Sequence, residues 1–469
     1  MYFFDDYTKF ESRSLAVCED GTNLCYRDLT AFSKQIGVHV PKRSLLFSFC
    51  SNTAGSLLGY LAFLNNRIVP VMVDSGIDAA LVAQLIDTYQ PQYLYLPQNM
   101  AAQYPYAAPV FTAYGYTLLK TNFDTVYPLY DELALLITTS GSTGSPKLVR
   151  QSYQNLQANA TSIVEYLEID ETERPISTLP MNYVYGISII NSHVQMGATL
   201  LFTTKSIMQK EFWTFFKEQN ATSFGGVPYT YEMLKRLRFF NMDLPSLRYM
   251  TQAGGKLVPA LHKEFAEYAQ AQGKRFYIMY GAAEATSRMG YLPWQKSLEK
   301  YGSMGYVIPG GCFTLIDADD KPITTPDTVG ELVYSGKNVT LGYALCGADL
   351  AKGDERGGIL QTGDMAKFDA DGFYYIVGRK ARFIKIYGNR VSLDECERMI
   401  KAKYEQADCA CVGVDDKMTI YLTDETLLPA VVHYVADTTH LNRNAFCAKF
   451  IETIPKNESG KTMYAKLDT

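Results

Sequence analysis

Runs of apolar residues alternate with segments of helical spacing through the first 300 residues of the chain. Continuous apolar runs of four or five residues predict strands that are buried on both faces, and they fall at residues 45–49, 68–72, 93–96, 133–137, 198–202 and 276–280. Between them, residues 77–89 and 261–270 place apolar side chains three and four positions apart, which predicts helices. This alternation is typical of parallel sheets covered by helices.

The pattern changes near residue 305, where short apolar runs at 312–316, 330–334 and 373–377 are separated by Pro, Gly and Asp. Short apolar runs separated by turn-forming residues predict a small β-rich subdomain. After Gly378 the chain has the pattern of a compact α+β unit of about 90 residues. Its helix should begin at Ser392, where the Ser392 hydroxyl and the Glu395 carboxylate can each accept from a free amide of the first turn.

We therefore predict an α/β fold of two domains. The large N-terminal domain of helix-covered sheets would span residues 1–378 and contain the β-rich subdomain at about 305–378. A small, mobile α+β C-terminal domain would span residues 379–469. At roughly 150 residues per domain, a chain of 469 residues allows this division.

Composition excludes several classes of partner. The net charge is −5 and there is no basic block, which argues against nucleic acid and against an anionic membrane surface. No run approaches the roughly 18 apolar residues of a membrane-spanning helix. The first residues lack the pattern of a signal peptide, and nine scattered Cys suit reduced thiols. We expect a soluble cytoplasmic protein; the sequence does not indicate its oligomeric state.

The strongest local signal is a loop rich in glycine and hydroxyl groups that directly follows the apolar run 133–137. It is Thr138-Thr-Ser-Gly-Ser-Thr-Gly-Ser-Pro-Lys147. Glycines let the backbone approach an anion closely, and amides, hydroxyls and Lys147 can bind phosphate oxygens. The loop is not a Walker A motif, because Ser-Pro-Lys follows its second glycine. A Ser/Gly-rich surface loop is the alternative interpretation.

This loop resembles the phosphate loop of the adenylate-forming superfamily, which contains acyl- and aryl-CoA synthetases, luciferases and the adenylation domains of peptide synthetases. Further blocks match the family in order along the chain: Tyr280-Gly-Ala-Ala-Glu284, Gly330-Glu-Leu, Gly342-Tyr343, Thr362-Gly-Asp364, Gly378-Arg379 with the hinge region to Glu397, and Pro455-Lys-Asn-Glu-Ser-Gly-Lys461. Matches in this order over most of the chain exclude a chance likeness to one loop.

The resemblance implies that a carboxylate attacks the α-phosphorus of Mg²⁺-bound ATP, which gives an acyl adenylate and pyrophosphate. A thiol then displaces AMP. It further implies a role for each matching residue: phosphate binding for Thr139, Ser140, Gly141, Ser142, Thr143, Gly144 and Lys147; a Mg²⁺ ligand for Glu284; contacts to adenine for Gly254, Gly255, Tyr280 and Gly281; ribose contacts for Asp364 and Arg379; and contact with the α-phosphate during adenylation for Lys461.

Lys385 has a separate implied role. In the family the small domain rotates about its hinge after adenylation, and a second face then meets the active site for thioester formation. The strip around Lys385 would line the path of the thiol, with Gly388 leaving room for the pantetheine arm. An ordinary lysine on a strand edge is the alternative.

Three positions depart from the family pattern. Ala283 replaces the Thr that precedes the motif glutamate, so one hydroxyl contact to the α-phosphate is missing, and a backbone amide or Thr286 would have to replace it. Ala381 replaces the usual hinge Asp or Lys. Tyr464 replaces a basic residue that often follows the final lysine. A non-catalytic nucleotide-binding relative therefore stays open as a third hypothesis.

The acid pocket of the family maps onto Tyr183, Gly186, Phe224 and Tyr229 of this chain. Residues 178–196 contain no Asp or Glu, so the ammonium group of an α-amino acid would lack its partner. The aromatic residues favour an apolar or aromatic acid with one polar group, although core packing would also explain them.

The acceptor stays open, because CoA and the phosphopantetheine arm of a carrier protein present the same thiol. We expect an acid–thiol ligase that uses ATP as a substrate and requires Mg²⁺. An enzyme that forms an amide or ester through an acyl adenylate, or an adenylating unit without a thiol step, is the alternative.

Overall fold

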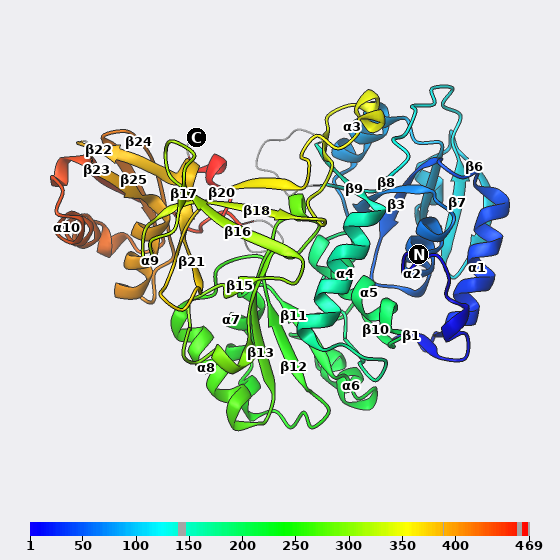
Figure 1. Cartoon of the computed structure of the whole chain (residues 1–469), viewed down its shortest axis with the longest axis horizontal. Helices are drawn as coiled ribbons and strands as arrows, with labels where there is room; N and C mark the ends of the chain where they lie inside the picture. Colours follow the sequence, from blue (N-terminus) through cyan, green and yellow to red (C-terminus); the bar gives the residue numbers. More distant parts are fainter. Residues whose placement is uncertain (139–146, 388, 457–461, 468–469) are drawn as a thin grey trace. The chain divides into compact units, whose positions relative to one another are not determined.

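The computed structural model describes residues 1–138, 147–387, 389–456 and 462–467 (Figure 1). The chain packs into two compact units. The first contains Met1–Tyr301, Val307–Cys312 and Ser335–Leu360; the second contains Gly302–Tyr306, Phe313–Tyr334 and Gln361–Thr469. The domain boundary expected at 378 remains a prediction.

An eight-stranded sheet forms one half of the first unit. Its order is β19-β9-β8-β4-β3-β5-β7-β6, and the strands are β3 (Leu45–Cys50), β4 (Val69–Asp74), β5 (Tyr93–Pro97), β6 (Ala108–Ala113), β7 (Tyr116–Lys120), β8 (Leu133–Thr138), β9 (Leu148–Ser152) and β19 (Gly342–Ala344). The inner strands β3, β4, β5 and β8 are parallel. Every side chain of β3 is buried, as its largely apolar sequence predicts.

The same part of the chain contains three helices, α1 (Tyr26–His39), α2 (Ala54–Asn65) and α3 (Ala79–Tyr89). A smaller sheet of β10 (Leu200–Phe202), β1 (Ser14–Cys18) and β2 (Asn23–Cys25) belongs to the same unit.

A second sheet has the order β11-β12-β13-β14-β15. Its strands are β11 (Ser223–Gly226), β12 (Tyr249–Gln252), β13 (Arg275–Tyr280), β14 (Gly290–Leu292) and β15 (Tyr306–Val307), and β11, β12 and β13 are parallel. Helices α6 (Lys210–Glu218), α7 (Pro228–Arg236) and α8 (Pro259–Ala271) flank it. An aromatic cluster joins these elements through contacts among Phe216, Phe224, Tyr231, Phe265 and Phe276.

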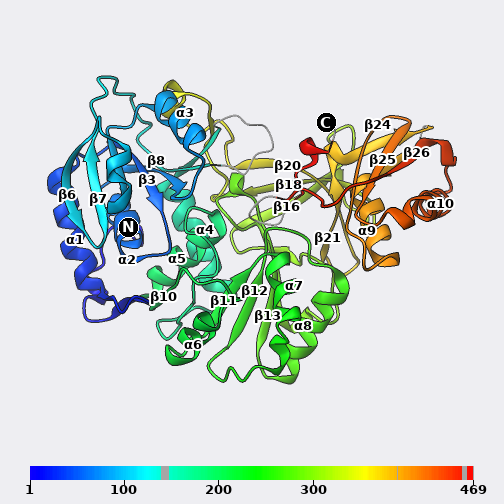
Figure 2. The ribbon, with the colours of Figure 1, turned by 180° about the vertical axis from the view of Figure 1, so that it is seen from behind.

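Helices α4 (Tyr153–Leu167) and α5 (Val184–Met196) lie between the two sheets (Figure 1), and the view from behind shows the same arrangement (Figure 2). One face of the pair packs into the core of the eight-stranded sheet, where Leu156 and Ile187 are buried. The opposite face packs with the second sheet through Tyr166 and Tyr185. Ser152 begins α4 by accepting a hydrogen bond from the Asn155 amide at 3.0 Å.

A sheet of order β17-β16-β18-β20-β21 lies mostly in the second unit and contains the short apolar runs from which a β-rich subdomain is predicted. Its strands are β16 (Gly311–Ile316), β17 (Pro322–Ile323), β18 (Gly330–Gly336), β20 (Ile359–Phe368) and β21 (Tyr374–Arg379). A hairpin of β22 (Phe383–Ile386) and β23 (Asn389–Ser392) follows. The remaining elements are α9 (Leu393–Lys403), β24 (Cys409–Val414), β25 (Lys417–Leu422), α10 (Leu428–Thr439) and β26 (Phe446–Phe450).

The start of α9 bears out half of the predicted capping pattern. The Ser392 hydroxyl accepts from the Glu395 amide at 3.2 Å. The Glu395 carboxylate pairs instead with Arg398 on the next turn of the helix, because a guanidinium three residues away offers a stronger partner than a backbone amide.

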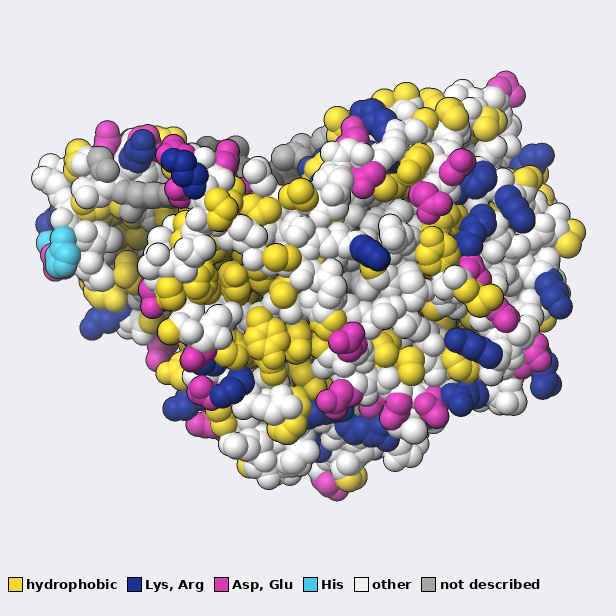
Figure 3. All heavy atoms as spheres, viewed as in Figure 1, with side chains coloured by type: hydrophobic (Ala, Val, Ile, Leu, Met, Phe, Trp, Pro, Cys, Tyr) yellow, Lys and Arg dark blue, Asp and Glu magenta, His cyan; other side chains and the backbone are white. Residues whose placement is uncertain are grey.

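The predicted strands at 45–49, 68–72, 93–96, 133–137, 198–202 and 276–280 are confirmed as β3, β4, β5, β8, β10 and β13, and the predicted helices as α3 and α8. Acidic and basic side chains are interspersed on the face shown in Figure 3. Among the described residues, no helix has the length and apolar character needed to cross a membrane.

Candidate active site

The glycine-rich loop joins two neighbouring strands at the edge of the eight-stranded sheet. Thr138 at the end of β8 pairs with Leu148 at the start of β9. Thr139, Ser140, Gly141, Ser142, Thr143 and Gly144 lie outside the described residues, whereas Lys147 is described. The Lys147 ammonium nitrogen lies 3.8 Å from the centroid of the Tyr343 ring, a distance typical of a cation–π contact.

Glu284 meets the same tyrosine. It lies in the turn after β13, and its Oε1 accepts a hydrogen bond from the Tyr343 hydroxyl at 2.5 Å. Burial, followed by the effect of the Glu284 carboxylate, raises the pKa of Tyr343 to about 12. The hydroxyl therefore stays protonated at neutral pH and acts as the donor. Two residues predicted from separate motifs, Lys147 and Glu284, thus converge on one side chain of β19.

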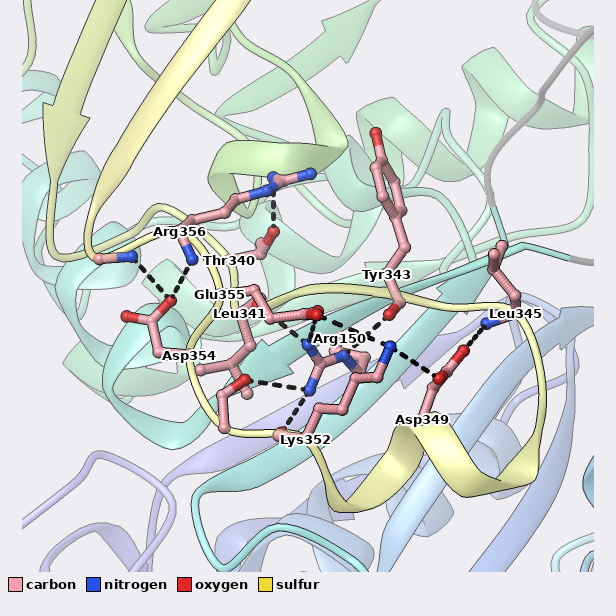
Figure 4. Close-up of polar contacts among 12 residues, drawn as sticks. Arg150, Thr340, Leu341, Tyr343, Leu345, Asp349, Lys352, Asp354, Glu355 and Arg356 are labelled. Carbon is pink, nitrogen blue, oxygen red and sulfur yellow. Dashed lines mark hydrogen bonds and ion pairs between the residues drawn. The ribbon is translucent and has the colours of Figure 1, made fainter.

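Arg356 adds a second cation to this group. Its Nη1 donates to the Glu284 carbonyl and to the Thr340 hydroxyl, both at 3.0 Å, and its guanidinium carbon lies 4.8 Å from the Tyr343 ring centroid. Figure 4 shows Arg356, Thr340 and Tyr343 on the segment that follows β18. Sequence reasoning missed Arg356, because no motif contains it.

A buried arginine on β9 holds this segment in place. The Arg150 side chain is fully buried and donates to the carbonyl groups of Leu341, Tyr343 and Lys352 and to the Glu355 carboxylate (Figure 4). We call residues 341–355 the Arg150-bound strap. Since the strap carries Tyr343, Arg150 fixes the backbone from which the tyrosine reaches Glu284.

The predicted adenine surface surrounds the end of β13. Tyr280 is the last residue of this strand. A Cβ atom at Gly281 would lie 1.7 Å from the Ser287 carbonyl oxygen, so this position requires glycine. Gly254 has φ +82° and lies against the Tyr183 hydroxyl, where a Cβ would approach to 2.7 Å. Gly255 lies beside Pro228.

Thr286 does not supply the hydroxyl that is missing at Ala283. Its side chain is buried and donates to the Asn338 carbonyl at 2.7 Å. Its backbone has φ +63°, which is unfavourable for a β-branched residue. Ala283 itself packs against the apolar core around the eight-stranded sheet. Of the two replacements considered from the sequence, the Thr286 hydroxyl is therefore engaged in holding the loop.

The four residues expected at the acid pocket lie in different surroundings. Tyr183 precedes α5, and Gly186 lies where a Cβ would meet the Pro180 carbonyl oxygen at 2.2 Å. Phe224 lines a cavity between α4, α5 and the second sheet and also belongs to the aromatic cluster. The Tyr229 side chain on α7 is 53% exposed and does not line that cavity.

In the second unit, Asp364 and Arg379 form a pair across β20 and β21. Arg379 Nε lies 2.7 Å from Asp364 Oδ1; the aspartate side chain is 8% exposed and the arginine 58%. Arg379 also donates to the Thr362 carbonyl at 3.2 Å. The two residues predicted to contact a ribose are thus neighbours.

Lys385 is exposed on β22, and its backbone amide donates to Asp415 at 2.8 Å. Gly388 and Lys461 lie outside the described residues. Ala381 lies in the turn Lys380–Arg382. Tyr464 packs under the Arg382 guanidinium, with 3.7 Å to the ring centroid, and donates to Glu397 at 3.0 Å. The aromatic replacement at 464 therefore packs within the second unit.

A family model described as AMP-binding enzyme matches residues 8–344. This chain belongs to the AMP-binding enzyme family. The match confirms the resemblance to adenylate-forming enzymes inferred from the motifs.

Curated relatives of this AMP-binding enzyme are named as CoA ligases. It is 27% identical over 357 residues to 2-succinylbenzoate–CoA ligase of Bacillus pumilus (strain SAFR-032), which covers 74% of this chain and 70% of the relative. It is 27% identical to oxalate–CoA ligase of Arabidopsis thaliana, covering 71% and 66% of the two chains. A 30% match to 2-succinylbenzoate–CoA ligase of Geobacillus sp. (strain WCH70) covers 62% and 58%. The aligned part is thus less than two thirds of the latter two relatives.

Solved structures confirm the α/β fold. The o-succinylbenzoate CoA synthetase of Bacillus subtilis, in complex with an acyl-adenylate intermediate, has a TM-score of 0.80 at 20% identity and covers 100% of this chain and 98% of that one. ATP-bound MatB from Rhodopseudomonas palustris has a TM-score of 0.80 at 19% identity, with the same coverage.

The chemistry of Glu284 fits the Mg²⁺ ion that the family implies. Glu284 offers a partly exposed carboxylate, and the one hydrogen bond to Tyr343 leaves lone pairs on both oxygens. Among the described residues, no group of three or more His, Cys, Asp or Glu side chains could hold a metal. One carboxylate is nevertheless enough here, because Mg²⁺ is usually bound by one or two carboxylates, water and phosphate oxygens.

Proposed function

We propose that this AMP-binding enzyme activates a carboxylic acid with ATP and transfers the acyl group to a thiol. A carboxylate oxygen of the acid bonds to the α-phosphorus of ATP, the bond from that phosphorus to the bridging oxygen breaks, and pyrophosphate leaves. The thiolate sulfur then bonds to the acyl carbon, and AMP leaves. The observation that carries the proposal is the convergence of Lys147 and Glu284 on Tyr343 in a chain of this family.

The electrostatic task of the first step explains these residue types. Two anions, the carboxylate and the triphosphate, must meet, and positioned cations reduce their repulsion. Lys147 supplies one positive charge, and Arg356 supplies another near the same ring. Mg²⁺ held by Glu284 would neutralise phosphate charge. Tyr343 orients the carboxylate of Glu284 and keeps both cations near it.

The remaining predicted residues keep the roles implied by the family. Asp364 and Arg379 would bind the ribose hydroxyls, and Lys461 would contact the α-phosphate in the first half-reaction. Lys385 and Gly388 would serve the second half-reaction, in which the thiol enters. The pairing of Asp364 with Arg379 supports their joint assignment.

The acid is proposed not to be an α-amino acid. Helix α5 and the segment before it carry no carboxylate that could pair with a buried ammonium group. Relatives named as ligases of 2-succinylbenzoate and of oxalate with CoA support a carboxylic acid of another class, and they favour CoA as the thiol.

Product analysis tests this assignment. The purified protein is incubated with ATP, Mg²⁺ and a panel of carboxylic acids, together with CoA, a holo carrier protein or a simple amine, and the products are identified by mass spectrometry. We expect an acyl thioester and AMP. Products with amines but none with either thiol would overturn the proposal in favour of an amide ligase.

A further inference from the structure

Among the residues that the structure describes, Arg288 is a buried cation with no acidic partner. It follows the Glu284 motif by four residues, and only 3% of the residue is exposed. Its Nη1 donates to the Ser287 hydroxyl at 2.5 Å, and its Nε points to the Met279 sulfur at 3.4 Å. The guanidinium carbon lies 3.9 Å from the Tyr185 ring centroid. None of the ion pairs within the described ranges involves Arg288.

These neutral contacts leave the charge of Arg288 uncompensated. Burying a guanidinium is costly unless a carboxylate or a full set of hydrogen bonds replaces its hydration. The other buried arginine of the same unit illustrates the difference, since Arg150 binds three carbonyl groups and the Glu355 carboxylate. Arg288, by contrast, faces a sulfur atom, hydroxyl groups and an aromatic ring.

Arg288 lines the cavity between α4, α5 and the second sheet. The cavity has a volume of about 20 Å³, which suffices for about one water molecule in this conformation. Its lining combines polar and aromatic groups, including Tyr185, Ser188, Ser192, Phe224 and Thr251. His193 also lines it, but burial lowers the pKa of this ring to about 4. At neutral pH, Arg288 is thus the one charged side chain among the described lining residues.

The cavity lies directly behind the turn that carries the candidate active site. The Met289 amide donates to the Tyr280 carbonyl at 2.9 Å. A Cβ atom at Gly281 would lie 3.1 Å from the Arg288 Cα. The backbone of Arg288 therefore packs against the first residues of the Tyr280–Glu284 motif, and Arg288 lines the same cavity as Phe224, one of the residues expected at the acid pocket.

We propose that Arg288 binds a second anionic group of the acid substrate, so that the enzyme activates a dicarboxylic acid. One carboxylate reacts with ATP, and the other replaces the missing partner of Arg288. A guanidinium binds a carboxylate through two parallel hydrogen bonds, and hydroxyl groups of the cavity supply further donors. This inference rests on the proposed function and sharpens it: the polar group expected on an apolar or aromatic acid becomes a carboxylate.

Equilibrium binding of acids tests the Arg288 site without requiring catalytic activity. Titration calorimetry in the presence of α,β-methylene-ATP compares matched pairs of acids: glutarate with pentanoate, adipate with hexanoate, and isophthalate with 3-methylbenzoate. For the unmodified protein we expect at least one diacid to bind about 10- to 100-fold more tightly than its monoacid, as a charge-assisted pair implies. Arg288→Met should abolish this difference, and Arg288→Lys should retain part of it.

Arg43→Gln is the matched control. It removes a partly buried guanidinium that binds the Leu133 carbonyl and the Tyr153 hydroxyl, outside the cavity, and it should leave the preference for diacids unchanged. Thermal melting shows whether each variant is folded, and Arg288→Lys keeps the test valid if the Met variant is not. Equal binding of mono- and diacids, or no binding of any acid, would overturn the inference.

Pyrophosphate exchange with the same acids distinguishes the two proposals. Selective binding of diacids without exchange would refute the proposed activity but support the Arg288 site. Exchange with monoacids that equals exchange with diacids, and that Arg288→Met leaves unaltered, would refute the Arg288 site but support the activity.

Discussion

The Tyr343 hydroxyl donates a 2.5 Å hydrogen bond to Glu284, although 59 residues separate the two in sequence. The Tyr343 ring also contacts Lys147 and Arg356. This tyrosine connects the glycine-rich loop, the turn after β13 and the Arg150-bound strap. We infer that it positions Glu284 for the role in ATP binding that we propose.

Tyr343→Phe should therefore weaken adenylation without dismantling the site. The ring and its cation contacts remain, but Glu284 loses a charge-assisted hydrogen bond of about 1.5 kcal/mol or more. We expect kcat/KM for adenylation to fall about 10-fold, with a higher Mg²⁺ concentration needed for half-maximal rate. Tyr106→Phe, at a partly exposed residue away from the site, is the control. An unchanged Mg²⁺ dependence would argue against a positioning role.

Arg150→Met should destabilise the first unit. The substitution leaves three carbonyl groups of the strap without their donor, and Glu355 without its partner. Loss of one member of a buried ionic network costs about 3 kcal/mol, and Glu355 is partly exposed, which moderates the cost. We expect a lower denaturation midpoint and slower adenylation. Lys235→Met, which breaks the exposed pair with Glu264, should cost less; equal losses would show that the strap contacts contribute little.

Lys461→Ala and Lys385→Ala should affect different half-reactions. If the small domain presents two faces in turn, Lys461→Ala abolishes adenylation but spares thioester formation from supplied acyl adenylate. Lys385→Ala should do the opposite. The two steps are measured separately by pyrophosphate exchange and by consumption of synthetic acyl adenylate with CoA. Equal loss of both steps in both variants would contradict the two-state hypothesis.

Stability should fall as the pH drops below about 6.5. Burial lowers the pKa of His193 and of His262 from 6.5 to about 4. Below pH 6.5 the unfolded chain binds protons that the folded chain does not, so each histidine favours unfolding until the pH reaches about 4. Between pH 7 and pH 5 each should cost about 2 kcal/mol.

Denaturant titrations of the unmodified protein and of His193→Gln at both pH values check this expectation. The variant removes one titrating group, so its stability should depend less on pH. A pH dependence identical to that of the unmodified protein would show that His193 is not held neutral in the folded state.

The local hydrophobic pattern predicted the strands well, because a short, largely apolar run such as β3 leaves few alternatives to a buried strand. Motif order likewise identified Lys147 and Glu284. Their meeting at Tyr343 was beyond sequence reasoning, since it depends on β19 pairing with β9 across nearly 200 residues. The same holds for Arg288, whose isolation from acidic groups is a property of packing. The Thr286 hydroxyl shows the converse, because proximity in sequence suggested a role that its contact with Asn338 prevents.

We expect the site around Lys147, Glu284 and Tyr343 to activate a carboxylic acid with ATP. Acid-dependent exchange of labelled pyrophosphate into ATP measures this step directly and requires no knowledge of the acceptor. We predict Mg²⁺-dependent exchange with at least one acid of a broad panel, and a loss of about 100-fold or more in Glu284→Gln, as expected for removal of a group that acts on transition-state charge. No exchange with any acid, or exchange that Glu284→Gln leaves intact, would contradict the account.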